Sequence, residues 1–259
     1  MSAPVTHEFA PDYTSAIVRP SPNHTERRGT DRPDMIILHY TGMPTEAGAL
    51  EWLCTPESEV SCHYVVNMDG TVYQLVAEDR RAWHAGKSHW KGETDINSHS
   101  IGIEIANPGH PSLPDFTEPQ IAAVIDLCRD VIARLEIAPE RVLAHSDVAP
   151  VRKIDPGEHF PWGRLHEAGI GHWVPAAPIA GGRFFQFGDA GPPVEALQSM
   201  LALYGYGVPV SSEFCDKTKG VIEAFQRHFR PEKIDGVADI STLDTLHRLL
   251  AGLPRFRNA

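Results

Sequence analysis

Two histidines of this chain each follow a short apolar run that is typical of a buried strand. His39 follows the run in "DMIILHYTGM" (34–43), and His145 closes "RVLAH" (141–145). A histidine at the end of a core strand could be a packed residue, a general base or a metal ligand. Neither histidine decides among these roles alone, so the chemistry depends on the side chains that join it.

Lys153 and Asp155 lie in the proline-containing segment "AHSDVAPVRKIDPGEHFPW" (144–162). Asp155 precedes Pro156, which biases its backbone toward an extended conformation. In an extended stretch, residues two apart project to the same side, so a cation and a carboxylate would enter one site together. The alternative is a solvated loop pair that contributes little energy.

Two histidines and one carboxylate around an open position form a familiar catalytic zinc arrangement. Such an ion polarises a carbonyl and lowers the pKa of a bound water, which suits hydrolysis of an unactivated amide. Glu104 in "SIGIEIAN" (100–107) projects opposite a face of isoleucines. It is therefore either a candidate general base in a cleft or an ordinary residue on a solvated sheet surface.

Two further histidines have the same ambiguity. His63 occurs in "SCHY" and His84 in "AWHAG". Each could be a half-buried structural histidine or a cleft residue that contacts a polar substrate.

The elements that must position these side chains follow a mixed α/β pattern. Strands are predicted at 35–40 and 100–107, where apolar residues run or alternate, and at 141–145. The segment 61–76 predicts two strands around an Asp-Gly turn, which is a strong hairpin signal. The strongest helix prediction covers 117–135, where a Thr and a Gln three residues later form a capping-box pattern.

The chain divides into four segments by composition. Residues 1–33 are polar and Pro-rich and predict an irregular lead-in, and 34–173 hold the α/β pattern. Pro, Ala and Gly without periodicity predict a linker at 174–183. Residues 184–259 predict a small three-helix domain, whose third helix begins at "STLD" (241–244) with Ser and Asp in a capping-box-like arrangement.

Charge and composition exclude several classes of function. The 259 residues carry a formal net charge of −11, which argues against nucleic acid and anionic membrane surfaces as partners. Apolar runs are too short to cross a bilayer. The N-terminus lacks a basic start followed by an apolar stretch, so we expect a cytoplasmic protein, or one of the periplasm or cell envelope if the true start lies upstream or export is non-standard.

The four cysteines form no CxxC pair, so a cysteine zinc site is not predicted. Cys54 and Cys62 lie close enough in sequence to meet, but a reducing compartment disfavours a disulfide between them.

Five motifs in order give the chain a specific resemblance. They are "ILHYTG", "SCHYVVNMDGTVYQLV", "AWHAG", "IGIEIANPG" and "LAHSDVAPVRKIDPGEHFPW". Together, and with the ten-residue step from His145 to Asp155, they resemble the zinc-dependent N-acetylmuramoyl-L-alanine amidases of the type 2 amidase family, whose fold peptidoglycan recognition proteins share. The resemblance covers roughly residues 20 to 173, and the tail resembles a small peptidoglycan-binding domain.

The resemblance implies a fold and a ligand set. The fold is α/β, with a mixed central β-sheet flanked by helices, followed by a small three-helix domain. His39, His145 and Asp155 would bind one Zn²⁺ ion. Some relatives carry Cys at the place of Asp155, so the resemblance is to the hydrolytic type with a His-His-Asp ligand set.

The resemblance also implies roles around the ion. Glu104 would assist the attacking water, and Lys153 would stabilise the developing oxyanion. The groove that binds substrate would be lined by Tyr40, His63, Trp83 and His84.

The implied reaction is hydrolysis of the amide between N-acetylmuramic acid, or its 1,6-anhydro form, and L-alanine of the stem peptide, in cell-wall turnover or muropeptide recycling. The partner is then peptidoglycan or a muropeptide, and we expect a monomer. Two alternatives stay open at this point: a non-catalytic peptidoglycan-binding protein, and a zinc hydrolase of another amide.

Overall fold

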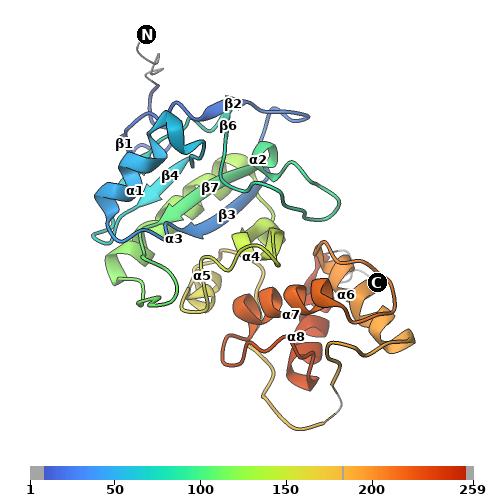
Figure 1. Cartoon of the computed structure of the whole chain (residues 1–259). Coiled ribbons are helices and arrows are strands. Elements are labelled where there is room, and N and C mark those ends of the chain that lie inside the picture. Colours follow the sequence, from blue (N-terminus) through green and yellow to red (C-terminus); the bar gives the residue numbers. More distant parts are fainter. Residues whose placement is uncertain (1–8, 183, 255–259) are drawn as a thin grey trace.

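A six-stranded mixed β-sheet forms the centre of the first part of the protein (Figure 1). The computed structural model describes residues 9–182 and 184–254. The strand order is β1-β5-β4-β7-β3-β8, and only the β4–β5 pair is antiparallel. The strands of this sheet are β1 (Ile17–Val18), β3 (Met35–Tyr40), β4 (Tyr64–Val66), β5 (Val72–Gln74), β7 (Ser100–Ile105) and β8 (Val142–Ala144).

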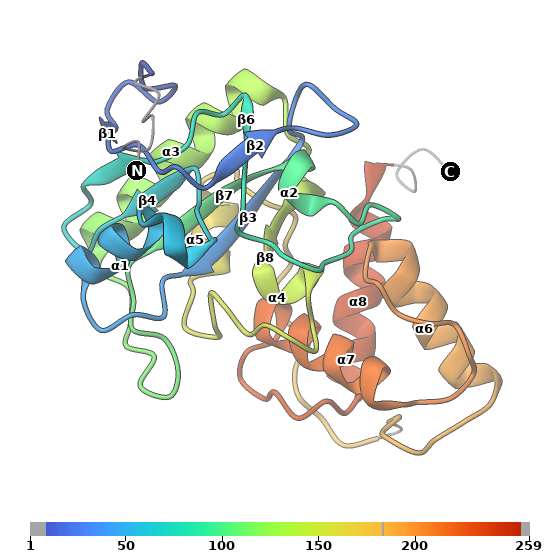
Figure 2. The ribbon, with the colours of Figure 1, turned by 45° about the horizontal axis from the view of Figure 1, so that its top comes forward.

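Helices cover both faces of this sheet, as Figures 1 and 2 show. The longest, α3, packs on one face through a stripe of apolar residues, and α1 lies over the other. The helices of this part are α1 (Glu46–Leu53), α2 (Ile96–His99), α3 (Glu118–Leu135), α4 (His145–Val148) and α5 (Trp162–Glu167), with 3-10 turns η1 (Pro56–Ser58) and η2 (Pro139–Arg141). The predicted α/β class with a mixed sheet between helices is thus confirmed.

The alternation of side chains along the strands decides which residues reach the site. In β3, Ile36 and Leu38 pack toward α3, so His39 points to the opposite face, because successive side chains alternate. Parallel pairing places His39 directly beside Glu104 on β7. The isoleucines of β7 face α3, and Glu104 therefore lies on the same face as His39.

Several local predictions are confirmed. The turn at Asp69 and Gly70 joins β4 to β5, and Gly70 adopts a positive φ of 86°. The Thr117 side chain caps α3 by accepting a hydrogen bond from the Gln120 amide. The Gln120 side chain does not complete the box, because it donates instead to the carbonyls of Val66 and Ala106 in the sheet.

The lead-in at 1–33 is not irregular throughout, which corrects the prediction. Among its described residues, β1 pairs with β5, and β2 (His24–Glu26) pairs with β6 (Arg80–Ala82) in a two-stranded antiparallel sheet. These strands have only two and three residues, too few to show a periodic signal in the sequence.

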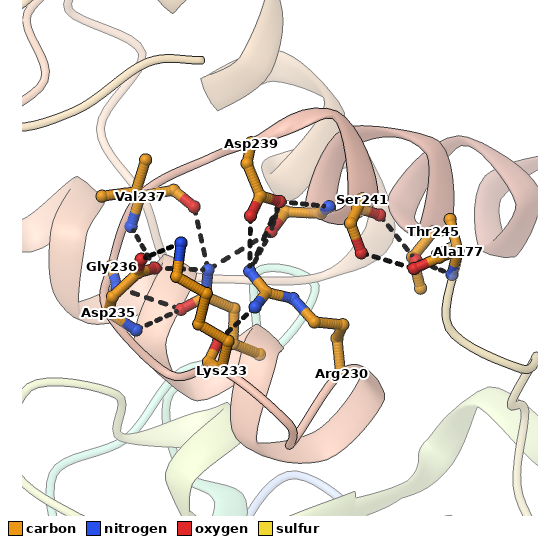
Figure 3. A network of polar contacts seen from close by, with 11 residues as sticks. Ala177, Arg230, Lys233, Asp235, Gly236, Val237, Asp239, Ser241 and Thr245 are labelled. Carbon is orange, nitrogen blue, oxygen red and sulfur yellow. Dashed lines mark hydrogen bonds and ion pairs between the residues drawn. The ribbon is translucent and has the colours of Figure 1, made fainter. Parts of the chain in front are cut away.

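Three helices make up the C-terminal part, which we call the helical module: α6 (Pro192–Tyr204), α7 (Asp216–Phe229) and α8 (Ile240–Gly252). Residues 174–182 contain no helix or strand. This stretch is nevertheless held in place, because Ser241 donates to the Ala177 carbonyl and Thr245 accepts from the Ala177 amide (Figure 3).

The start of α8 differs from the prediction. Asp239, not Ser241, caps the helix by accepting a hydrogen bond from the Thr242 amide. Asp239 also pairs with Arg230, whose side chain is fully buried and donates to Thr242 and to the Lys233 carbonyl (Figure 3). A buried guanidinium is stable only when such partners neutralise it. Asp239 is held beside Arg230 for this reason, and there it also caps α8.

A single hydrophobic cluster runs from the sheet into the helical module. Met35 and Ile37 of β3 belong to it, as do Trp90, Tyr206 and Phe225. Figures 1 and 2 place α7 next to α4.

Among the described residues, none of the helices has the length and apolar character needed to cross a membrane. All four cysteines are free.

Candidate metal centre

Three side chains from two strand ends and one loop converge at a single point. His39 lies near the end of β3, His145 follows β8 directly, and Asp155 comes from the loop beyond α4. The His39 and His145 Nδ1 atoms lie 2.9 Å apart, and the Asp155 Oδ2 atom lies 3.0 Å from each. All three residues are buried. Within the described ranges they form the one group of three such side chains with the spacing of a metal site.

The other ring nitrogens of the two histidines are held by neighbours. His145 Nε2 lies 3.1 Å from the Ala85 carbonyl oxygen, which can only accept, and 3.4 Å from Arg152 Nη2, which can only donate. Arg152 Nη2 already donates to the Ala85 carbonyl at 2.6 Å, so we assign the Nε2 proton to the shorter contact with Ala85. In this tautomer the His145 Nδ1 atom has a lone pair directed at His39 and Asp155.

The proton of His39 is placed by a longer chain of contacts. Ser100 donates its hydroxyl proton to the Ile96 carbonyl at 2.6 Å, so its oxygen accepts from His84 Nε2 at 3.1 Å. His84 Nδ1 is then bare and accepts from His39 Nε2 at 3.0 Å. His39 Nδ1 consequently also has a free lone pair toward the convergence point.

This arrangement fits a bound cation. Two bare imidazole nitrogens and a carboxylate oxygen face one another at about 3 Å, and like partial charges at this distance repel unless a positive ion lies between them. Histidines that bind metal usually donate their second nitrogen to such a neighbour. The three residues therefore form a possible metal site, with the soft and hard donors that zinc accepts.

Ionisation in the pocket agrees with a ligand role. Burial, together with the nearby His145, lowers the pKa of His39 to about 4, so the ring is neutral at neutral pH. Burial opposes ionisation of Asp155, but positive charge on His145 and hydrogen bonds from the two histidine rings, whose place a bound cation would take, hold the pKa of Asp155 well below its usual range. Metal ligands must be deprotonated, and both groups are.

Glu104 and Lys153 line the same cavity as the three candidate ligands. Burial first, and then the charge of Asp155, raises the pKa of Glu104 well above its usual value, while Lys153 lowers it. The Glu104 Oε2 atom is buried and has no hydrogen-bond partner among the described residues. A buried, unpartnered carboxyl beside a cavity is suited to exchange a proton with a bound molecule.

The cavity has a volume of about 310 Å³, and both polar and apolar side chains line it. The polar lining includes the candidate ligands. The apolar lining comes from α1 and the loops around it: Met43, Ala49, Trp52, Leu53 and Val60. These five residues were not predicted from the sequence. Trp52 is about half exposed, a property of a contact residue that only the structure reveals.

The structure sorts the four predicted groove residues into two groups. Tyr40, Trp83 and His84 line the cavity. His63 does not: it is fully buried, its Nδ1 accepts from the Gly102 amide at 2.9 Å, and its Nε2 lies 3.0 Å from the Arg80 carbonyl oxygen. His63 therefore joins β4 to β7 and β6 in the core and does not face the cavity.

His84 has a second role that the sequence does not predict: it is the hydrogen-bond partner of His39. This position is possible because Gly102 lies under the ring: a Cβ atom there would fall 2.5 Å from His84 Cγ. The sequence also does not predict the roles of Ser100 and of the Ala85 carbonyl. Each arises from a contact made only in the folded chain, Ser100 with His84 and Ala85 with His145.

Comparison with known proteins finds two family models along the chain. One, described as N-acetylmuramoyl-L-alanine amidase, matches residues 29–158. The other, described as "Putative peptidoglycan binding domain", matches residues 190–246. The two matches fall on the α/β part and on the helical module.

Two curated proteins illustrate the relationship. The N-acetylmuramoyl-L-alanine amidase AmiD of Escherichia coli (strain K12) is 39% identical over 236 residues, covering 85% of this chain and 83% of the relative. The 1,6-anhydro-N-acetylmuramyl-L-alanine amidase AmpD of Enterobacter cloacae is 31% identical over 164 residues, covering 57% of this chain and 86% of the relative.

Solved structures agree with these matches. A complex of E. coli AmiD with the substrate anhydro-N-acetylmuramic acid-L-Ala-D-gamma-Glu-L-Lys superposes with a TM-score of 0.72 at 33% identity, covering 88% of this chain and 97% of that chain. AmpDh3 from Pseudomonas aeruginosa gives a TM-score of 0.71 at 30% identity, covering 88% and 96%. AmpDh3 has also been solved in complex with an anhydromuramic pentapeptide.

Proposed function

The chain belongs to the N-acetylmuramoyl-L-alanine amidase family, and we propose that it hydrolyses the amide between N-acetylmuramic acid, or its 1,6-anhydro form, and L-alanine of the stem peptide. The observation that carries the mechanism is the convergence of three possible donor atoms, from His39, His145 and Asp155, on the wall of a cavity. The reaction serves peptidoglycan turnover or muropeptide recycling.

We assign one Zn²⁺ ion to these three residues. When bound, zinc supplies a Lewis acid for the amide carbonyl and lowers the pKa of a water molecule. The donor set suits it, because two neutral imidazoles and one carboxylate leave a coordination position for substrate or water. The Ala85 carbonyl and His84 would hold the two rings in the ligating tautomer.

Glu104 would transfer protons in this reaction, and Lys153 would stabilise charge. Glu104, with its raised pKa, would accept a proton from the attacking water and pass it to the leaving amine of L-alanine. Lys153, on the cavity wall, would stabilise the negative charge that develops on the carbonyl oxygen. Both groups line the cavity that holds the candidate ligands, so both can reach a bound amide.

We propose that the substrate lies along Tyr40 and Trp83, with the amide beside the three candidate ligands. AmiD and AmpDh3 have each been solved with an anhydromuramoyl peptide, and this supports the same substrate class here. Residues 34–173 would then form the catalytic domain, 174–183 the linker, and 184–259 a domain that binds peptidoglycan.

The compartment stays a prediction from the sequence. A cytoplasmic enzyme would meet muropeptide fragments, and one in the periplasm or cell envelope would meet the wall itself. Cell fractionation with an antibody against the protein decides between them.

Replacing Glu104 tests the mechanism. In Glu104→Ala and Glu104→Gln variants, we expect cleavage of an anhydromuramoyl tripeptide to fall by at least about 100-fold, since general acid–base catalysis contributes 10²–10⁴-fold. Zinc binding should be largely spared, because Glu104 is not a ligand. Glu118→Gln, at an exposed glutamate that pairs with Arg164, is the matched control and should keep full activity. Full activity in the Glu104 variants would contradict the mechanism.

A further inference from the structure

Helix α7 of the helical module meets the catalytic part at the segment that carries two of the three candidate metal ligands. Asp147 lies two residues after His145, in α4, and its side chain is fully buried. Its Oδ2 atom accepts a hydrogen bond from the Ala144 amide at 2.8 Å, directly before His145. The Asp147 carboxylate thereby closes the turn that presents His145.

The same carboxylate is held by the helical module. His228 Nδ1, on α7, lies 2.7 Å from Asp147 Oδ2, and the Tyr206 hydroxyl donates to Asp147 Oδ1 at 2.7 Å. The His228 ring also stacks on Trp162, with ring centroids 3.7 Å apart. A fully buried carboxylate depends on such partners, and the loss of one leaves a costly unpaired acceptor.

A second contact from α7 reaches the other end of the segment. Arg227, next to His228, pairs with Glu158, three residues after Asp155, at 3.4 Å. Glu158 in turn lies 3.2 Å from His110 Nε2, and His110 Nδ1 lies 3.2 Å from the Tyr40 hydroxyl at the cavity. Two adjacent residues of α7 therefore contact both ends of the segment 145–158.

The two ends of this segment are coupled to each other. The Ser146 amide donates to the Asp155 carbonyl at 3.0 Å, so a displacement of α4 is carried to the third ligand. The helical module itself is firmly attached, because Trp90 packs edge-on against Tyr204 and Tyr206 and the Lys91 amide donates to the Gly205 carbonyl at 2.9 Å. Closely packed cores transmit strain, which makes such an attachment a stiff support.

We propose that α7 braces the metal-binding segment, and that His228 and Arg227 are positioning residues for His145 and Asp155. The inference rests on the proposed function, because it concerns the same metal group. The helical module then has a role in catalysis apart from any attachment to peptidoglycan. It contributes even when the substrate is a small fragment with no glycan polymer to bind.

Substitutions at His228 separate hydrogen bonding from packing. His228→Phe keeps a ring to stack on Trp162 but removes the donor to Asp147, whereas His228→Asn keeps an N–H donor near the position of Nδ1. Lys219→Ala, on the same helix, is the control, because Lys219 is about half exposed and pairs with Glu223 of α7. We would measure zinc affinity by competition with a chromogenic chelator, and kcat and KM on a soluble anhydromuramoyl tripeptide.

We expect His228→Phe to weaken zinc affinity by about tenfold, the lower end of the effect seen for groups that orient metal ligands, and to lower kcat with KM unchanged. His228→Asn should recover most of the zinc affinity, and Lys219→Ala should match the wild type. If His228→Phe does not fold, Tyr206→Phe removes a single hydroxyl and is measured in the same way, with a weaker loss expected.

Wild-type zinc affinity and kcat in a folded His228→Phe protein would overturn the brace while leaving the amidase reaction intact. Loss of activity only on intact wall, with unchanged zinc affinity, would also overturn it, because that result is what a wall anchor predicts. Wild-type protein that neither binds zinc nor releases peptide would instead overturn the proposed function.

Discussion

At the scale of single residues, the site depends on where two protons lie. The chain of contacts from Ile96 through Ser100 and His84 leaves the His39 Nδ1 atom bare. The Ala85 carbonyl does the same for His145. Motif order predicted the ligands from the sequence, but not these neighbours, because His84 and Ser100 meet through side chains in the folded protein and no local spacing encodes that contact.

Gly102 offers a test at this scale. An alanine there would place its Cβ atom 2.5 Å from the His84 ring, so the ring must shift, which disturbs its contact with His39. We expect Gly102→Ala to weaken zinc affinity by about tenfold, because the His39 ring loses the neighbour that orients it. Gly181→Ala is the control, since a Cβ atom there meets nothing within 4 Å. Chelator competition gives both values, and unchanged affinity in a folded Gly102→Ala protein would contradict this account of the tautomers.

At the scale of elements, the sequence predicts strands and helices well where periodicity is long, and poorly where a tertiary contact decides. The alternation in β7 and the stripe of α3 were both visible. The cap of α8 was not: Ser and Asp at 241 and 244 fit a capping pattern, yet Asp239 is the cap because Arg230 is buried beside it. The role of His63 was missed for the same reason, since its ring bonds backbone groups of neighbouring strands.

Asp239 carries a prediction for this element. Asp239→Ala removes both the cap of α8 and a partner of the fully buried Arg230, so we expect the free energy of unfolding to fall by about 3 kcal/mol. Asp244→Ala, on the same helix, breaks only an exposed pair with Arg248 and should cost less than about 0.5 kcal/mol. Urea unfolding followed by circular dichroism measures both, and equal losses would contradict the assigned roles.

At the scale of the whole molecule, the catalytic part and the helical module share a hydrophobic cluster and a buried carboxylate. The sequence predicts two domains and a linker, but not this contact, because periodicity shows that a helix has an apolar face and not what covers it. Trp90 and Tyr206, which meet across the contact, lie more than a hundred positions apart. Through Asp147, this contact links the segment that carries His145 and Asp155 to α7 of the helical module.

The proposed function, zinc-dependent hydrolysis of muropeptides by the whole chain, is tested most directly by one measurement. The full-length protein is incubated with an anhydromuramoyl tripeptide, and mass spectrometry follows the free stem peptide before metal removal, after dialysis against a chelator, and after zinc is restored. We predict release of the peptide that stops on metal removal and returns with zinc. Absence of release in the presence of zinc, or release that persists after metal removal, would contradict the account.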